Sequence, residues 1–164
     1  MSTGILHTLP KPFFVLAPMD DVTDTVFRRI VAETAAPDLY FTEFVNVDGL
    51  QSPGREKLLP KLAFTDTETP IIAQLWGKTP ENYYKCAKEI KEMGFAGVDI
   101  NLGCPAKPIV QNGCCSALIN NRELTGEIIR AVREGVGPDF PVSVKTRLGF
   151  GQVDLTWIEF LLSH

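Results

Sequence analysis

Short runs of apolar residues alternate along this chain with longer segments in which apolar residues recur every three or four positions. The runs are typical of buried β-strands, and the longer segments are typical of helices that bury one face. The expected strands cover residues 13–17, 39–43, 70–76, 97–101 and 141–147, and the expected helices cover residues 23–35, 79–93, 123–136 and 154 to the end. A polar connection over residues 46–69, with a short element at 55–59, separates the second strand from the third.

Residues with known preferences for helix ends mark where these helices begin and stop. Thr23 is the expected N-cap of the first helix. Thr79 and Pro80 suit the cap and the first position of the second helix, and Gly94 suits the left-handed position that ends it. The apolar faces expected to be buried consist of Val26, Phe27, Ile30 and Val31 in the first helix, Tyr83, Ala87 and Ile90 in the second, Ile128, Ile129 and Val132 in the third, and Leu155, Ile158 and Leu162 in the last.

Strand and helix alternate from the first strand to the end of the chain. This order is typical of parallel strands joined by right-handed helical crossovers. The alternation alone leaves two α/β architectures open, a doubly wound sheet and a closed eight-stranded barrel. The first strand is not followed by a Gly-x-Gly-x-x-Gly turn, which disfavours the dinucleotide-binding form of the open sheet. A barrel needs about 250 residues, so five strands amount to an incomplete one.

The last two expected strands each have an apolar face and a polar face, because alternate side chains of a strand point to opposite sides of the sheet. In the strand over residues 70–76, Gln74 shares its side with Ile72. The β-branched residues would pack beneath the connecting helices. The polar residues would point into the centre of a barrel, towards the carboxyl ends of the strands. These polar residues are Gln74, Asp99, Asn101, Ser143, Lys145 and Arg147.

Two explanations fit a polar set of this size. The groups can satisfy one another as a buried network, since most buried polar groups in proteins are paired. A bound, polar and planar ligand is the simpler explanation, because unpaired polar groups in a packed interior are costly. Barrel enzymes also bind their substrates at the carboxyl ends of the strands.

Composition narrows the class of protein further. The chain has 164 residues and a formal net charge of −4, and its basic residues are scattered, which argues against this segment alone being a strong nucleic-acid binder. No apolar run approaches the ~20 residues that cross a bilayer. Residues 1–11 lack the pattern of a secretory signal, so a cytoplasmic protein is expected. No metal site is expected, because the histidines are both near the termini and the cysteines lack paired spacing.

Cys104 is placed differently from the other three cysteines, Cys86, Cys114 and Cys115. It follows the fourth strand directly in a Gly-Cys-Pro turn, where glycine permits an unusual backbone angle and proline fixes the next one. Cys86 fits the usual role of cysteine as an inert apolar residue of a helix, and Cys114 and Cys115 are expected to pack at a turn. A thiol held in a rigid turn can be a nucleophile or a proton donor, and the lack of an internal histidine favours the proton donor.

Motifs spread over nearly the whole chain resemble those of the tRNA-dihydrouridine synthases, in the family's order and spacing. Each motif alone is weak, and the set together is highly specific. The motifs are Ala17-Pro-Met19, Thr23-Asp24, Phe27-Arg28, Gln74-Leu-Trp-Gly77, Asn101-Leu-Gly-Cys-Pro105 and Val144-Lys-Thr-Arg147.

The resemblance implies an α/β fold, a (β/α)8 TIM barrel of which this chain holds roughly the first five β/α units. It implies FMN as the cofactor, NADPH or NADH as the reductant and tRNA as the substrate. Uridine would be reduced to 5,6-dihydrouridine by hydride transfer to C6, with Cys104 protonating C5. The uracil would be flipped out of its stack to reach the flavin.

The resemblance also implies roles for particular residues. Asn101 and Arg147 would contact the substrate base or its nucleotide. Gln74 would hydrogen-bond the isoalloxazine edge, and Lys145 would place positive charge near the N1 and O2 atoms of the reduced flavin. The residues that would line the flavin after the first strand are Pro18, Met19 and Asp20.

Two departures from the family pattern are visible. Where the family has a glycine-rich Gly-x-Gly-Ala turn, this chain has Cys114-Cys-Ser-Ala117. The family's later phosphate-binding segments and helical tRNA-binding domain do not follow within residues 1–164, so the chain is expected to be the N-terminal portion of the FMN-binding domain. Two other interpretations stay open: another FMN-dependent barrel enzyme, similar to dihydroorotate dehydrogenase, or a non-catalytic half-barrel fragment that serves folding or assembly.

Overall fold

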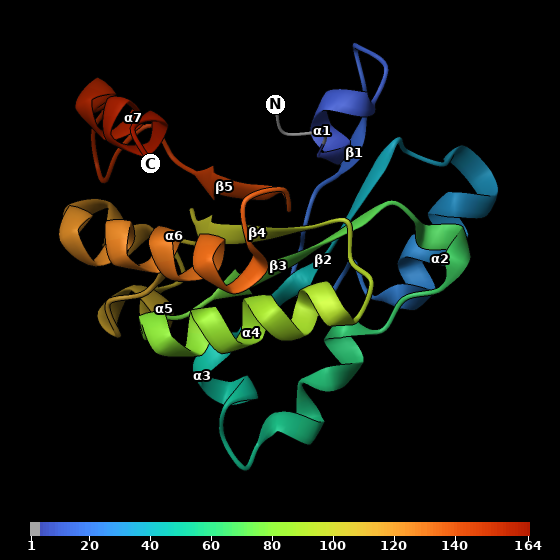
Figure 1. Ribbon diagram of the computed structural model, residues 1–164, viewed down its shortest axis with the longest axis horizontal. Coiled ribbons are helices and arrows are strands. Elements are labelled where there is room, and N and C mark those ends of the chain that lie inside the picture. Colours follow the sequence, from blue (N-terminus) through green and yellow to red (C-terminus); the bar gives the residue numbers. More distant parts are fainter. Residues whose placement is uncertain (1–3) are drawn as a thin grey trace.

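The computed structural model describes residues 4–164, so the first three residues of the segment that lacks a secretory pattern lie outside it. Within the described chain, five parallel strands form one sheet (Figure 1). The strands are β1 (Val15–Leu16), β2 (Leu39–Asn46), β3 (Ile71–Trp76), β4 (Gly97–Leu102) and β5 (Val142–Thr146). The α-helices are α1 (Ile5–Thr8), α2 (Thr25–Ala35), α3 (Val47–Leu50), α4 (Pro80–Glu92), α5 (Lys107–Gln111), α6 (Arg122–Val136) and α7 (Leu155–Leu162), and the 3-10 helices are η1 (Arg55–Lys57), η2 (Leu59–Leu62), η3 (Asp66–Glu68) and η4 (Cys115–Asn120).

The order of the strands decides between the two α/β architectures. The strands are neighbours in strict chain order, from β1 to β5, and each adjacent pair is parallel. In a doubly wound sheet the order of the strands reverses at a switch point, and the connecting helices cover both faces. Figure 1 instead shows α4 and α6 side by side on the same side of the sheet. The five strands therefore curl into a half-barrel, which confirms the expected partial TIM barrel.

The core lies between the central strands and the two longest helices. Every residue of β4 is buried, as are five of the six residues of β3. The expected apolar faces of α4 and α6 are buried against these strands, which confirms the helical periodicity. Gly94 has φ +88°, the left-handed conformation expected where α4 ends.

Two glycines of α6 provide a matched test of how closely the helices pack. A Cβ at Gly135 would lie 2.6 Å from the backbone oxygen of Tyr84 in α4, whereas one at Gly126 would lie 2.9 Å from the side-chain Nε2 of His164. Alanine is the better helix former by about 1 kcal/mol. We expect Gly126→Ala to leave the free energy of unfolding unchanged or raise it, because the histidine can move. Gly135→Ala should lower it by roughly 1–3 kcal/mol, because backbone must shift. Urea unfolding measures both, and equal effects would contradict the close helix contact.

The two ends of the sheet differ from the sequence-based expectations. The first expected strand is not buried: β1 has two residues, and Phe14 and Val15 are 74% and 46% exposed. The N-cap of α2 is Asp24, which accepts a hydrogen bond from the backbone of Phe27, and not Thr23. Most of the expected apolar faces of α2 and α7 are exposed, namely Val26, Phe27, Ile30, Leu155 and Leu162.

The exposure has a simple geometric cause. β1 and β5 are the edge strands of the sheet, and each is paired on one side only. Apolar faces at those edges therefore find no neighbouring layer within residues 4–164. In α2 the buried side chain is Arg28, and in α7 it is Trp157.

The long connection before β3 is more ordered than its polar sequence indicated. It contains α3, η1, η2 and η3, so the expected short element at residues 55–59 is confirmed as the first two 3-10 turns. No pattern in the sequence indicated α1, α5 or η4. Among the described residues, no helix combines the length and the hydropathy that a membrane crossing requires.

Candidate active site

The carboxyl ends of β3, β4 and β5 bring the predicted polar residues to one region of the sheet. The strand register places Asp99 of β4 between Gln74 of β3 and Ser143 of β5. Two residues further along, Asn101 lies beside Lys145. The alternation of faces read from the sequence is therefore confirmed.

Four of these residues form a network, in which Gln74, Asp99 and Asn101 are buried and Ser143 is half-buried. Asp99 accepts hydrogen bonds from Gln74 Nε2 at 2.5 Å and from Ser143 Oγ at 2.6 Å, and Asn101 Nδ2 donates to Gln74 Oε1 at 3.1 Å. The sequence favoured a ligand as the explanation for this polar set. For these four residues that explanation is unnecessary, because they satisfy one another within the chain.

The turn that carries Cys104 is held by hydrogen bonds from both sides. Asn101 Oδ1 accepts from the backbone N–H groups of Gly103 and Cys104, each at 3.0 Å. The carbonyl of Gly103 accepts from Arg147 Nε at 2.6 Å, and the carbonyl of Cys104 accepts from the backbone of Ser116 at 3.3 Å. The backbone of the turn is therefore held by hydrogen bonds, without the unusual angle expected at Gly103, whose φ is not positive.

The other three cysteines are buried and unreactive by comparison. All four thiols are free, and Cys104 alone is half-buried. Burial raises the pKa of Cys86 to about 11. Burial also raises the pKa of Cys114 and of Cys115 above the ordinary value. Because the thiolate is the reactive form of cysteine, a raised pKa makes a thiol less reactive. These three cysteines therefore suit a role in packing.

Cys115 explains why a glycine-rich turn is expected at this point. Its φ is +52°, in the left-handed region that glycine adopts without strain. The following Ser116 supplies the N–H that holds the Cys104 carbonyl. The chain therefore keeps the turn that supports Cys104 although its sequence departs from the family pattern.

Lys145 and Arg147 differ from the buried network. Both side chains are exposed, near the carboxyl end of β5. Arg147 Nε donates a hydrogen bond to the carbonyl of Gly103 in the Cys104 turn. The positive charge of Lys145 acts to lower the pKa of Asp99. One cation, Arg147, is therefore bonded to the turn that carries the half-buried thiol, and a second, Lys145, lies beside Asn101 in the strand register.

The loop after β1 carries the residues expected to line a flavin. Pro18 is half-buried, while Met19 and Asp20 are exposed. The backbone N–H of Met19 donates to Thr23 Oγ1 at 3.0 Å, and Thr23 itself is fully buried. This bond closes the loop onto its own base.

A cluster of carboxylates beside this loop is held by a lysine that the sequence did not single out. Oxygens of Asp20, Asp21 and Glu43 lie within 4.8 Å of one another. Lys61 Nζ lies 2.5 Å from Asp20, 3.5 Å from Asp21 and 3.1 Å from Glu43. Partial burial alone would lower the pKa of Lys61, but its hydrogen bonds to Asp20 and Glu43 raise that pKa above its ordinary value. The ammonium group forms ion pairs with all three carboxylates, and these pairs connect the loop to Glu43 of β2.

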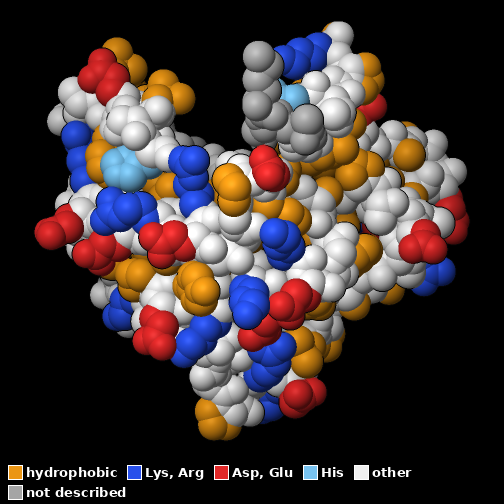
Figure 2. Space-filling model, in the orientation of Figure 1, with side chains coloured by type: hydrophobic (Ala, Val, Ile, Leu, Met, Phe, Trp, Pro, Cys, Tyr) orange, Lys and Arg blue, Asp and Glu red, His pale blue; other side chains and the backbone are white. Residues whose placement is uncertain are grey.

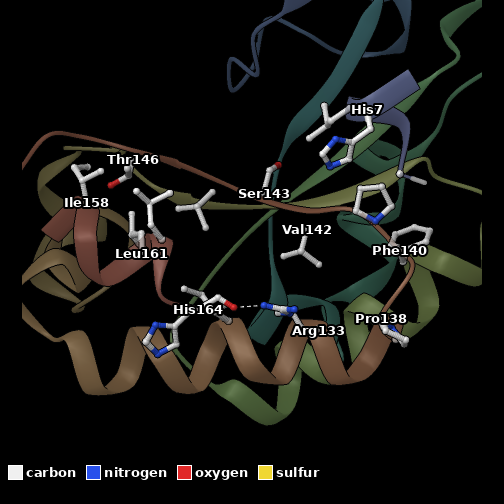
Figure 3. Close-up of a pocket in the computed structure, with 17 residues that line it drawn as sticks. His7, Arg133, Pro138, Phe140, Val142, Ser143, Thr146, Ile158, Leu161 and His164 are labelled. Atoms are coloured by element: carbon white, nitrogen blue, oxygen red, sulfur yellow. Dashed lines mark hydrogen bonds between the residues drawn. The ribbon is translucent and has the colours of Figure 1, made fainter. Parts of the chain in front are cut away.

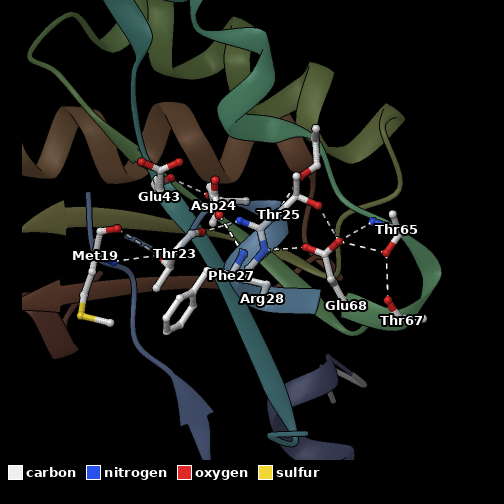
Figure 4. A network of polar contacts seen from close by, with 12 residues as sticks. Met19, Thr23, Asp24, Thr25, Phe27, Arg28, Glu43, Thr65, Thr67 and Glu68 are labelled. Carbon is white, nitrogen blue, oxygen red and sulfur yellow. Dashed lines mark hydrogen bonds and ion pairs between the residues drawn. The ribbon is translucent and has the colours of Figure 1, made fainter. Parts of the chain in front are cut away.

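A buried ion pair contacts the end of the same loop at Thr23 (Figure 4). Arg28 Nε lies 2.7 Å from Glu68 Oε2, and neither side chain has any exposed surface. The other two guanidinium nitrogens donate to the carbonyls of Thr23 and Ala63, each at 2.6 Å. Glu68 lies in the polar connection, where no periodicity indicated a buried residue, so sequence reasoning missed this pair.

A hollow lies elsewhere, along the free edge of β5 (Figure 2). It has a volume of about 540 Å³ and runs between α7 and the N-terminal part of the chain. Figure 3 shows Val142 and Ser143 among its lining residues, with His7 on one side and His164 on the other. Because β5 is paired only with β4, this hollow marks the open edge of the sheet.

The residues expected to line a flavin are chemically compatible with one, with one restriction. Lys145 is an exposed cation, and Met19 offers an exposed apolar side chain. Gln74 is fully buried and bonded to Asp99 and Asn101. One N–H of Gln74 Nε2 and one lone pair of Gln74 Oε1 are not used in these two bonds. A ligand at the strand ends could form hydrogen bonds with Gln74 only through these.

Asp99 should make the stability of the protein depend on pH. Burial raises the pKa of Asp99 to about 6, against the opposing effect of its bonds to Ser143 and Gln74 and of the charge of Lys145. Because the folded state binds this proton more tightly than the unfolded state, its contribution is present at low pH and is lost as pH rises through 6. Relative to Asp99→Asn, the wild-type free energy of unfolding should fall by about 2 kcal/mol between about pH 4 and pH 7. A difference between the two proteins that stays constant with pH would contradict the raised pKa.

Comparison with known proteins gives this site a family. A family model described as Dihydrouridine synthase (Dus) matches residues 15–161. The chain is 46% identical over 162 residues to the protein named "Probable tRNA-dihydrouridine synthase 2" of Bacillus subtilis (strain 168), covering 98% of this chain and 49% of that protein. It is 44% identical over 162 residues to a "Probable tRNA-dihydrouridine synthase" of Staphylococcus epidermidis, covering 98% of this chain and 48% of that protein.

These relatives are about twice as long as the sequence described. The chain spans about half the length of the curated relatives it matches. The family model nevertheless covers every strand of the sheet and the Cys104 turn. The chain belongs to the dihydrouridine synthase family.

Proposed function

We propose that this chain is the N-terminal portion of the FMN-binding barrel of a tRNA-dihydrouridine synthase, and that the full-length enzyme reduces uridine in tRNA to 5,6-dihydrouridine. The observation that carries the proposal is Cys104: a half-buried thiol at a strand end, in a turn that Asn101 and Arg147 hold by hydrogen bonds, inside the region that matches the family. The other barrel strands and a helical tRNA-binding domain would come from the rest of the full-length protein.

The chemistry divides between the cofactor and the side chains of this chain. Reduced FMN, replenished by NADPH or NADH, would supply the hydride to C6 of the uracil. Cys104 would donate its thiol proton to C5, a general-acid step for which a held, partly exposed thiol is suited. Lys145 would hold positive charge near the flavin ring, where negative charge develops.

The remaining residues would position the two ligands. Asn101 and Arg147 would contact the uracil or its nucleotide. Pro18, Met19 and Asp20 would line the flavin from the loop that Lys61 and Arg28 tie down. The base must leave its stack to reach this edge, since a flavin cannot approach it inside a helix.

The mild net negative charge of the chain does not rule out this substrate. A net charge of −4 leaves most of the grip on tRNA phosphates to other parts of the full-length protein. We infer that the enzyme works in the cytoplasm, where its tRNA substrate is found.

A substrate comparison tests the proposal. Full-length enzyme with FMN is incubated either with NADPH and tRNA that lacks dihydrouridine, or with dihydroorotate and an electron acceptor such as NAD⁺, fumarate or a quinone. We expect dihydrouridine in the digested tRNA by mass spectrometry and no oxidation of dihydroorotate. Turnover of dihydroorotate without any change in the tRNA would assign the site to a different flavin-dependent barrel enzyme.

A further inference from the structure

Asp99 is a buried carboxylate to which the proposed reaction gives no role. It lies in the middle of β4 with 2% of its surface exposed. Its two oxygens accept hydrogen bonds from Gln74 Nε2 and Ser143 Oγ. Because an ionised carboxylate can only accept hydrogen bonds, it determines which end of the Gln74 amide faces it.

The orientation of Gln74 in turn determines that of Asn101. With Nε2 turned to Asp99, the Oε1 atom of Gln74 accepts a hydrogen bond from Asn101 Nδ2 at 3.1 Å. The Oδ1 atom of Asn101 is then turned towards the next turn of the chain. There it accepts from the backbone N–H groups of Gly103 and Cys104.

The opposite orientation of these amides would fail at the turn. If Gln74 were reversed, its Nε2 would face Asn101, which would have to present Oδ1 to it. Asn101 would then direct Nδ2 at two backbone N–H groups, and donors would face donors. A buried donor left without an acceptor costs about 1–3 kcal/mol. The direction of the whole chain of bonds therefore depends on an acceptor at residue 99.

We propose that Asp99 is a positioning residue that holds the Cys104 turn through the side-chain amides of Gln74 and Asn101. This role serves the reaction because Cys104 is the proposed proton donor, so it rests on the proposed function. Asp99 touches neither ligand in this role and acts only through its neighbours.

Protonation of Asp99 keeps the same direction of bonding. A neutral carboxyl group retains one carbonyl oxygen, which can accept from Gln74, and its O–H can donate to Ser143. Asparagine at residue 99 can do the same, with Oδ1 towards Gln74 and Nδ2 towards the hydroxyl of Ser143. Valine, which is close to aspartate in size and suits a strand, provides no acceptor.

Hydrogen exchange of the turn amides tests this role without any substrate. Exchange is measured by mass spectrometry on the full chain, in a peptide over residues 102–106 and in peptides from β2 and β3. In Asp99→Val, we expect the amides of Gly103 and Cys104 to exchange about tenfold faster than in wild type, with β2 and β3 unchanged. Asp99→Asn and the matched control Ser143→Ala, which removes only the other bond of Asp99, should exchange as wild type does. Unchanged exchange at the turn in Asp99→Val, or an equal acceleration in all peptides, would overturn the proposal.

A double variant covers the case in which Asp99→Val does not fold. In Asp99→Asn combined with Ser143→Ala, the asparagine loses the hydroxyl that accepts from its Nδ2, and nothing holds its oxygen towards Gln74. Faster exchange at the turn in the double variant than in either single variant would support the proposal. Wild-type exchange in the double variant would contradict it.

Kinetics of the full-length enzyme separate positioning from binding. In Asp99→Val, kcat for uridine reduction should fall about tenfold while KM for tRNA stays the same, and Asp99→Asn should restore most of kcat. A rise in KM with unchanged kcat would overturn the positioning role. If the enzyme does not reduce uridine at all, the exchange result still stands as a test of the hydrogen-bond chain, so the two failures are distinguishable.

Discussion

Replacing Arg28 with methionine should lower the free energy of unfolding by about 3–5 kcal/mol, because it leaves the carboxylate of Glu68 buried without its cation. Arg28 and Glu68 both have no exposed surface, and the pair lies 2.7 Å apart. The change also removes the donors that hold the carbonyls of Thr23 and Ala63. The melting temperature of a chain of this size should drop by on the order of 10 °C, measured by circular dichroism.

Two control variants identify the cause of the loss. Adding Glu68→Gln to Arg28→Met removes the buried charge while keeping an oxygen for Thr25 and Thr65, so part of the stability should return. Removing the lysine of the exposed Lys85–Glu81 pair should leave the free energy of unfolding nearly unchanged, because solvent screens the pair. An Arg28→Met variant as stable as wild type would show that the pair does not hold this part of the fold.

Replacing Cys104 with alanine should lower the rate of uridine reduction by about 10²–10⁴-fold in the full-length enzyme, which is the range for loss of a general acid. Flavin should stay bound, because the backbone of the turn is held by Asn101, Ser116 and Arg147 and not by the thiol. Stopped-flow oxidation of the reduced flavin by tRNA measures the rate, and the visible flavin spectrum measures binding.

Cys86 provides the matched control for this substitution. It is also a free thiol, but it is buried in α4, where burial raises its pKa to about 11. Cys86→Ala should keep nearly the full rate, at a modest cost in stability. Equal activity of the two alanine variants would remove Cys104 from the reaction.

The sequence predicted the inner part of the fold well because packing dictates its pattern there. The strands β2, β3 and β4 and the helices α4 and α6 are buried where the pattern of apolar residues indicated. At the two edges of the sheet the same periodicity was present, but Phe14 and Val26 are exposed because no described layer covers them. The spacing of apolar residues indicates which face of an element can be buried. It does not indicate whether another strand or helix is present to cover that face.

The site was predicted in position but not in its connections. Strand parity indicated Gln74, Asp99 and Asn101 from the alternation of residue types alone. The sequence could not show that these side chains bond to one another, because hydrogen-bond direction depends on the register between strands. It also gave no sign of Glu68 or Lys61, whose partners are distant in the chain.

The central claim is that this chain belongs to an enzyme that makes dihydrouridine in tRNA with Cys104 as proton donor. The most direct measurement is nucleoside mass spectrometry of tRNA from cells that lack their own dihydrouridine synthases and express the full-length protein. Dihydrouridine should return with the wild-type gene and stay absent with the Cys104→Ala variant at equal protein levels. The claim would be contradicted if cells accumulate the folded, flavin-loaded wild-type protein and their tRNA still contains no dihydrouridine.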